Sequence, residues 1–373
     1  MGAQANSQPE INDQGLVLRP WRAADAEAVH RACQDPAIQR WTRVPSPYRP
    51  EHARDFVTGH SAAAWREGTG APFAVVDPDT GDLLASCGLV TIDRVLSTAE
   101  VGYWTAPWAR GQGVATRATR AVSRWAFESL RLRRMVWQAE IGNHASRLVA
   151  LRAGFRVEGY LRLADDGSEG WAGTLLPGDP MDPVLDATVV RRARVFTHPQ
   201  PVLAAKGGLR LRPPEVRDFD AMTEACRDPE SVRWTTVPDP YERAHAEDFA
   251  LRITPTKWAR GDGVVYAIAG PDGAWAGSID LTISADDPFV GEVGFLAAPW
   301  VRGRGYTTAA LTALCDWGFR SLGLARIVWR AHVGNVASRR VAEKAGFAVE
   351  GTQRGALAHR GQRKDAWVGG LVP

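Results

Sequence analysis

The chain has 373 residues, 45% of them hydrophobic and 23% charged, and its 45 basic and 42 acidic residues give a net charge of +3. This length predicts two or three domains that each bury a core. The small net charge and the lack of any stretch of about 18 apolar residues argue against a nucleic-acid partner, a membrane surface and a membrane span. Four widely spaced cysteines, Cys33, Cys87, Cys226 and Cys315, lack the spacing of a zinc site, so we expect no metal and a reducing, cytoplasmic environment.

The N-terminal segment 1–15 is polar and lacks the apolar region of a secretory signal, which predicts a disordered segment on a cytoplasmic protein. Residues 16–18 predict a strand, and apolar spacing from Ala26 to Cys33 predicts a helix that ends before Asp35-Pro36. A proline-rich loop follows. The remaining predicted elements are a helix around 52–65, strands 73–76, 83–91 and 100–104, a helix 114–129, a strand 134–139, a helix 145–153 and a final pair of strands.

The whole series of elements occurs twice. Glu100 recurs as Glu292, a displacement of 192 residues (292 − 100), and Trp41 recurs as Trp234, a displacement of 193 (234 − 41). So long a period indicates duplicated domains rather than a solenoid. We therefore predict an α/β (mixed α+β) architecture in which each domain has a mostly antiparallel mixed sheet flanked by helices.

The domain boundaries are predicted from the repeat and from composition. The two domains are expected at 16–177 and 205–373. The segment 178–204 between them has the proline and glycine content of a linker, although 187–196 could form a short ordered element.

A glycine-rich turn joins a strand to the long helix in each copy. The first turn reads Arg110-Gly111-Gln112-Gly113, and the second reads Arg302-Gly303-Arg304-Gly305. Glycines remove the β-carbons that would keep a ligand away from the backbone. The helix N-terminus that follows offers unpaired amides and the positive end of the helix dipole, which favour an anion. The turns are therefore predicted to bind phosphate.

These passages resemble the [Q/R]-x-x-G-x-[G/A] motif of the GCN5-related N-acetyltransferases (GNAT), in which the motif holds the pyrophosphate of acetyl-CoA. The chain is similar to two tandem GNAT domains, each resembling the branch that acetylates the N-termini of ribosomal proteins (RimJ/RimL-like). The second copy departs from the motif, because Thr307 stands where the first copy has Ala115. The resemblance implies acetyl-CoA as co-substrate, contacted by Arg110, Gly111, Gln112, Gly113, Val114, Ala115 and Asn143 and by Arg302, Gly303, Arg304, Gly305, Tyr306, Thr307 and Asn335.

Glu100 and Glu292 begin the strand before each turn, and the resemblance implies that they act as general bases, often through water. A solvated carboxylate at a strand end is the alternative. His332 is a rival base in the second copy only. The resemblance also places Ser146 and Ser338 near the thiolate of the leaving group, as proton donors.

Asn143 and Asn335 precede predicted helices, so either could be only an N-cap. The thioester carbonyl would be polarised by backbone amides of the strand that contains Glu100 or Glu292.

Aromatic residues follow the first predicted helix of each copy. The resemblance places Trp41, Tyr48, Trp234 and Tyr241 at the acceptor site, and core packing is the alternative. The sequence therefore predicts an acetyl-CoA-dependent N-acetyltransferase that transfers the acetyl group directly, in a ternary complex, to a primary amine. The acceptor would be a protein or peptide N-terminus or a small molecule. The alternatives are one catalytic domain with a degenerate docking or pseudo-dimer domain, and a non-enzymatic acyl-CoA-binding module. A monomer with an internal pseudo-dimer and a homodimer both remain open.

Overall fold

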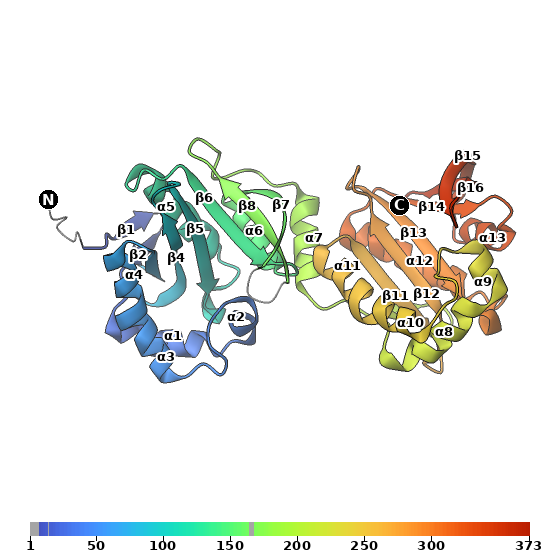
Figure 1. The fold of residues 1–373 in the computed structure, drawn as a ribbon, viewed down its shortest axis with the longest axis horizontal. Helices are drawn as coiled ribbons and strands as arrows, with labels where there is room; N and C mark the ends of the chain where they lie inside the picture. Colours follow the sequence, from blue (N-terminus) through green and yellow to red (C-terminus); the bar gives the residue numbers. More distant parts are fainter. Residues whose placement is uncertain (1–6, 14, 164–167) are drawn as a thin grey trace. The chain divides into compact units, whose positions relative to one another are not determined.

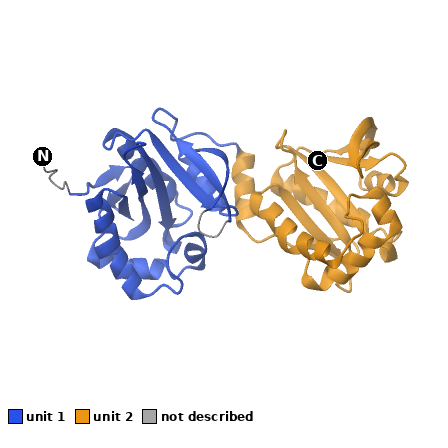
Figure 2. Cartoon of the chain, in the orientation of Figure 1, with its two compact units in different colours: residues 1–186 blue, residues 187–373 orange. Residues whose placement is uncertain are grey.

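The computed structural model describes residues 7–13, 15–163 and 168–373, so residues 1–6 and 14 of the expected disordered segment lie outside the described part. The chain divides into two compact units, Met1–Asp186 (unit 1) and Ala187–Pro373 (unit 2) (Figure 2). No helix in the described ranges is long and apolar enough to cross a membrane.

Unit 1 is built on an eight-stranded sheet in the order β1-β2-β3-β4-β5-β6-β8-β7 (Figure 1). β5 and β6 are parallel, and the other neighbouring strands are antiparallel. The strands are β1 (Ile11–Asp13), β2 (Leu16–Arg19), β3 (Ala71–Val76), β4 (Leu83–Asp93), β5 (Thr98–Thr105), β6 (Arg134–Glu140), β7 (Arg156–Arg162) and β8 (Glu169–Leu175). The helices are α1 (Ala26–Ala32), α2 (Pro36–Trp41), α3 (Pro50–Arg54), α4 (Ser61–Glu67), α5 (Val114–Glu128) and α6 (His144–Arg152), with a π-helical turn at Asp55–His60.

Unit 2 repeats this plan in the sheet order β15-β16-β14-β13-β12-β11-β10-β9, again with one parallel pair, β13 and β14. The expected mostly antiparallel mixed sheets with flanking helices are confirmed in both units. The strands are β9 (Leu203–Ala205), β10 (Leu209–Arg212), β11 (Gly263–Ala269), β12 (Trp275–Ile283), β13 (Val290–Ala297), β14 (Arg326–His332), β15 (Ala348–His359) and β16 (Gln362–Leu371). The helices are α7 (Ala187–Thr197), α8 (Phe219–Arg227), α9 (Pro229–Trp234), α10 (Arg243–Asp248), α11 (Thr254–Arg260), α12 (Tyr306–Leu322) and α13 (Val336–Lys344).

Helices cover both faces of each sheet, which the alternation of side chains along β3 illustrates. Phe73 and Val75 belong to the core that contains residues of α5. Ala74 and Val76 belong to the second core, with residues of α1, α2 and α3. Because successive residues of a strand point to opposite faces, a nearly continuous apolar run is needed where both faces are buried.

The parallel strands separate part-way along their length, and this opening positions the candidate site. β5 pairs with β6 only from Thr98 to Glu100, although β5 continues to Thr105. In unit 2 the pairing of β13 with β14 ends at Val293, although β13 continues to Ala297. Beyond these points, backbone amides and carbonyls of the two strands are open to another partner.

Two segments differ from the sequence-based expectation. Ile11–Asp13, within the segment expected to be disordered, forms β1, which pairs with β2 at the edge of the sheet. An ion pair from Arg124 of α5 to Asp13 also holds it. Trp41, expected in a loop, ends the short helix α2, because the Asp35 carboxylate caps the amides of Ala37 and Ile38 at 3.0 Å.

Within the expected linker, α7 belongs to unit 2. Phe196 of α7 is 4% exposed in the core of that unit. The Nε of Arg192 donates to the carbonyl of Leu322 at the C-terminal end of α12, at 2.9 Å. This contact satisfies a carbonyl that the helix itself leaves unpaired.

Candidate active site

The two glycine turns have the same backbone geometry. Gly113 and Gly305 are the N-caps of α5 and α12, with φ angles of 73° and 78°. Gly111 and Gly303 also have positive φ, at 77° and 80°. A β-carbon built on any of the four would meet no atom within 4 Å. The turns therefore present open space beside helix N-termini, which suits a phosphate group.

The arginine of each turn is held by an aspartate. Arg110 pairs with Asp35 at 2.6 Å, and Arg302 pairs with Asp228 at 2.5 Å. Each aspartate also caps α2 or α9, and its hydrogen bond to the arginine is the main cause that lowers the pKa of its carboxyl. The arginine side chains thus connect the turn to this short helix.

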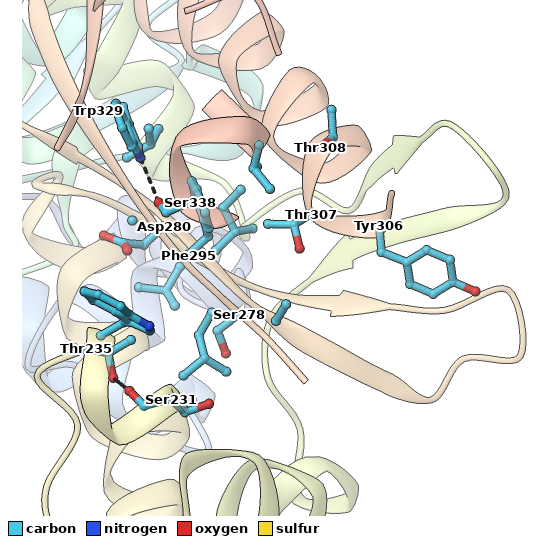
Figure 3. A pocket seen from close by; sticks show the side chains of 18 of the residues that line it. Ser231, Thr235, Ser278, Asp280, Phe295, Tyr306, Thr307, Thr308, Trp329 and Ser338 are labelled. Atoms are coloured by element: carbon cyan, nitrogen blue, oxygen red, sulfur yellow. Dashed lines mark hydrogen bonds between the residues drawn. The ribbon is translucent and has the colours of Figure 1, made fainter. Parts of the chain in front are cut away.

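The residues after each turn are largely buried. Ala115 is 8% exposed and Thr307, which replaces it in unit 2, is 9% exposed. Figure 3 shows Tyr306 directed away from Thr307. Gln112 donates to the carbonyl of Trp108 at 3.3 Å, and Val114 is 2% exposed.

Asn143 and Asn335 are N-caps, accepting from the amides of Ser146 and Ser338 at 3.1 Å. The side-chain oxygens of these serines accept from buried indoles. Ser146 Oγ accepts from Trp137 Nε1 at 3.1 Å, and Ser338 Oγ accepts from Trp329 Nε1 at 3.0 Å. A serine oxygen fixed in this way keeps its own proton available to donate.

A tyrosine distinguishes the serine of unit 1. The hydroxyl of Tyr103 donates to the backbone carbonyl of Ser146 at 2.9 Å and lies 3.1 Å from Ser146 Oγ. The strand position equivalent to Tyr103 is Phe295 in unit 2 (295 − 103 = 192). The Ser338 hydroxyl therefore has no corresponding phenol beside it.

The two candidate bases have different surroundings. Burial raises the pKa of Glu100, and the charge of Arg43 opposes this rise. Glu292 is instead paired with both Nε, at 3.0 Å, and Nη2 of Arg330, and this contact raises the pKa of Arg330. Unit 1 has Gln138 at the position of Arg330 (330 − 138 = 192). The two duplicated glutamates, Glu100 and Glu292, therefore have different electrostatic surroundings.

Unit 2 contains a cavity of about 1910 Å³ that joins the predicted cofactor and acceptor residues (Figure 3). Its lining includes Gly305 and Thr307 at the turn, Ser338 at the start of α13, and Trp234 of α9. Within the described ranges, Arg330 lines the cavity and Glu292 does not.

His332 also lines this cavity. Its ring lies edge-on to that of His359, with centroids 4.7 Å apart, and 6.3 Å from the ring of Trp234. Burial, followed by the charges of His359 and Lys364, lowers the pKa of His332. A histidine with a lowered pKa is neutral at pH 7 and able to accept a proton.

The predicted acceptor tyrosines are mostly inside the fold. Tyr48 is 5% and Tyr241 is 6% exposed. Burial raises the pKa of both hydroxyls and of the thiols of the neighbouring Cys33 and Cys226. Tyr241 also lines the cavity of unit 2.

The predicted acceptor tryptophans are half-buried. Trp41 lies under the guanidinium of Arg40, 4.3 Å from its ring centroid. Trp234 donates from Nε1 to Glu230 at 2.8 Å. The structure thus brings Trp234 and Tyr241 to the cavity wall of unit 2.

Residues 15–156 and 208–348 both match the family model described as an acetyltransferase (GNAT) domain. The chain belongs to the GNAT acetyltransferase family. It is 42% identical over 82 residues to the putative ribosomal N-acetyltransferase YdaF of Bacillus subtilis, which covers 22% of this chain and 45% of that protein. It is 37% identical over 81 residues to the ribosomal-protein-serine acetyltransferase of Escherichia coli, 21% of this chain and 45% of that protein. The matches thus span under half the length of these two relatives.

A longer match, 27% identical over 154 residues, is to the uncharacterized N-acetyltransferase YoaA of Bacillus subtilis, covering 41% of this chain and 86% of that protein. A solved structure of a putative ribosomal-protein-serine acetyltransferase from Vibrio cholerae is 24% identical with a TM-score of 0.42, over 46% of this chain and 99% of that one. The predicted family, fold and enzyme class are confirmed, and acetyl-CoA is the co-substrate that GNAT acetyltransferases use. The roles of individual residues stay predictions.

Some residues at the candidate site were not identified from the sequence. Arg330, Lys257 and Asp280 lie at or beside the cavity of unit 2, and Tyr103 contacts the serine of unit 1. Three of them could have been found from the sequence, because the two copies differ at these positions. Arg330, Asp280 and Tyr103 have Gln138, Gly88 and Phe295, respectively, as their equivalents in the other copy.

Proposed function

We propose that the chain transfers the acetyl group of acetyl-CoA directly to the α-amine of a protein or peptide N-terminus, in a ternary complex. The observation that carries the proposal is a continuous cavity in unit 2, which extends from the glycine turn to Ser338 and on to Trp234. A cofactor bound at the turn and an acceptor bound beside Trp234 would share that space. Direct transfer needs both substrates to be present together, since no covalent enzyme intermediate carries the acetyl group.

The acceptor class is supported by chemistry and by the relatives. An α-amine with a pKa near 8 is roughly 10% neutral at pH 7, whereas a lysine side chain with a pKa near 10.4 is below about 0.1% neutral. Since only the neutral amine is a nucleophile, an N-terminus needs less help from the enzyme. Two of the relatives are named as acetyltransferases of ribosomes or ribosomal proteins, one of them acting on a serine.

The chain supplies three groups to the reaction. The first amides of α12, beside Gly305, would bind the diphosphate. Backbone amides of β13 beyond Val293, where pairing with β14 has ended, would polarise the thioester carbonyl. The Ser338 hydroxyl, oriented by the indole of Trp329, would give a proton to the departing thiolate.

The test is an acetylation assay with labelled acetyl-CoA. The acceptors are a short peptide with a free N-terminal serine, the same peptide with a blocked N-terminus and an internal lysine, a polyamine and an aminoglycoside. We expect label in the first peptide and at least ten times less in the other three. Acetylation of the aminoglycoside or polyamine in preference to the peptide would overturn the protein-directed proposal.

A second candidate is a division of labour in which one domain is catalytic and the other docks the substrate. The different surroundings of Glu100 and Glu292 favour it, because Glu292 is paired with Arg330, whereas unit 1 has Gln138 at the equivalent position. The variants Gly113→Asp and Gly305→Asp place a carboxylate at one turn each. If both domains work, each variant retains part of the transfer, whereas a single catalytic domain makes one variant inactive and leaves the other near the wild-type rate.

A further inference from the structure

One cavity-lining carboxylate of unit 2 has no counterpart in unit 1. Asp280 lies on β12 directly opposite Gly294 of β13. The equivalent pair in unit 1 is Gly88 and Gly102. Gly294 follows the point at Val293 where β13 and β14 separate, so Asp280 is paired with the first residue of β13 beyond that point.

The carboxylate of Asp280 is held in place from one side. Lys257 Nζ of α11 contacts Asp280 Oδ2 at 2.8 Å, and Thr282 Oγ1 contacts the same oxygen at 3.2 Å. Lys257 also donates to Thr282 Oγ1 at 2.6 Å, which closes a three-residue network. Since both contacts use Oδ2, the other oxygen is the one directed over the strand.

Oδ1 lies directly above Gly294. A β-carbon built on Gly294 would be 2.6 Å from Asp280 Oδ1, so a side chain there would require the carboxylate to shift. In unit 1 a methyl group of Val90 takes the corresponding place above Gly102. The same point in the two sheets is therefore a carboxylate oxygen in unit 2 and an apolar group in unit 1.

Asp280 belongs to the cavity wall. Figure 3 draws Asp280, Phe295 and Ser338 among the side chains that line it. Glu292, the glutamate two residues before Gly294, is paired with Arg330. Within the described ranges, Asp280 lines the cavity and Glu292 does not.

We propose that Asp280 receives the amino group of the acceptor in unit 2. The proposal rests on the proposed acetyl transfer and names the residue that binds the acceptor nitrogen. Asp280 Oδ1 accepts a hydrogen bond from the nitrogen and so points the nitrogen lone pair at the thioester carbon. Lys257 and Thr282 act as positioning residues, because they fix the carboxylate through Oδ2.

The neutral amine attacks the carbonyl carbon, a C–N bond forms, the nitrogen becomes positively charged, and the carbonyl oxygen becomes an oxyanion. As the intermediate collapses, the nitrogen loses one proton to Asp280 Oδ1, the C–S bond breaks, and the thiolate takes a proton from Ser338 Oγ. Asp280 releases its proton to water and the serine regains one from water, so the net products are the amide and the free thiol.

The experiment uses the full chain carrying Gly113→Asp, so that transfer by unit 1 is suppressed, with the N-terminal serine peptide as acceptor. Asp280→Asn keeps the shape of the side chain and removes its charge. We expect kcat/KM for the peptide to fall roughly 10- to 100-fold, the range for loss of a charged hydrogen-bond partner, while Kd for acetyl-CoA changes less than about twofold. Asp286→Asn makes the same chemical change in the exposed β12–β13 loop and is expected to have no effect.

Asp280→Glu restores a carboxylate at a slightly different place, and we expect it to recover part of the activity. Activity of Asp280→Asn within twofold of the Gly113→Asp parent would overturn the assignment. So would a loss of acetyl-CoA affinity equal to the loss of activity, or a Gly113→Asp parent that transfers nothing while the wild type does. A wild-type chain that acetylates no amine would instead overturn the proposed function itself.

Discussion

Replacing the glycine that caps each long helix with alanine should distinguish the effect of the turn on stability from its effect on CoA binding. Gly113 and Gly305 have φ angles of 73° and 78°, so an alanine there costs roughly 1–2 kcal/mol of stability at each site. In the free protein the added β-carbon meets no atom within 4 Å, so no further steric cost is expected. The double variant should therefore fold.

The substitutions should weaken CoA binding by more than they destabilise the fold. The added β-carbon would enter the space proposed for the diphosphate of CoA. It would move the diphosphate oxygens away from the helix amides. Loss of two charge-assisted hydrogen bonds, at about 1.5–3 kcal/mol each, raises Kd at least 100-fold at about 1.4 kcal/mol per tenfold.

Gly81 and Gly273 provide a matched control. They are equivalent in the repeat (273 − 81 = 192), have φ angles of 77° and 81°, and have no atom within 4 Å of an added β-carbon. Thermal unfolding and titration calorimetry with CoA compare the double variants. We expect a similar loss of stability in both and a loss of CoA affinity only in Gly113→Ala/Gly305→Ala. Wild-type CoA affinity in that variant would refute the account of the turn.

Three further predictions concern stability, pH and mechanism. Asp218 is 2% exposed and pairs with the buried Arg212 at 2.7 Å, so Asp218→Ala should destabilise unit 2 by about 3–5 kcal/mol in urea unfolding. The control Asp316→Ala breaks the exposed pair with Arg320 and should cost less than about 1 kcal/mol. Equal losses of stability in the two variants would contradict this reasoning. Because burial raises the pKa of Glu100 in the folded state, the wild type loses stability as pH rises through that pKa. Glu100→Gln should therefore have a higher Tm than the wild type at pH 7, with the difference shrinking toward pH 4; a difference that grows on acidification has the wrong sign. In the chain carrying Gly113→Asp, Ser338→Ala should lower kcat by less than about tenfold at pH 8, because a thiol with a pKa near 8.5 leaves with little acid assistance. A thousandfold loss would contradict this reasoning.

The repeat, the sheet class and the glycine turns were predictable because local chemistry determines them. Positive φ at Gly113 and Gly305 favours glycine, and the strand before and the helix after each turn have clear periodicity. The short helix α2 was not predicted. Asp35-Pro36 ends one helix and also begins the next, and it was interpreted only as the end of the first helix. β1 was not predicted either, since its three residues are ordered through β2 and Arg124 and not by their own composition.

The residue types of the candidate site were predictable from the sequence, but the contacts that these side chains make were less so. Asn143 and Asn335 are at the expected helix starts, and the indole contacts of Ser146 and Ser338 come from strands that only the fold brings near. The inequality of Glu100 and Glu292 depends on Arg330, which lies 38 residues along the chain from Glu292. Pairing across adjacent parallel strands connects them, so the local pattern around each glutamate contains no sign of it.

The most direct test of the central claim is a crystal structure of the full chain with CoA. We expect diphosphate oxygens about 3 Å from the first backbone amides of α5 and α12, and the sulfur beside Ser146 or Ser338. CoA bound away from both glycine turns, or both turns empty at saturating CoA, would contradict it.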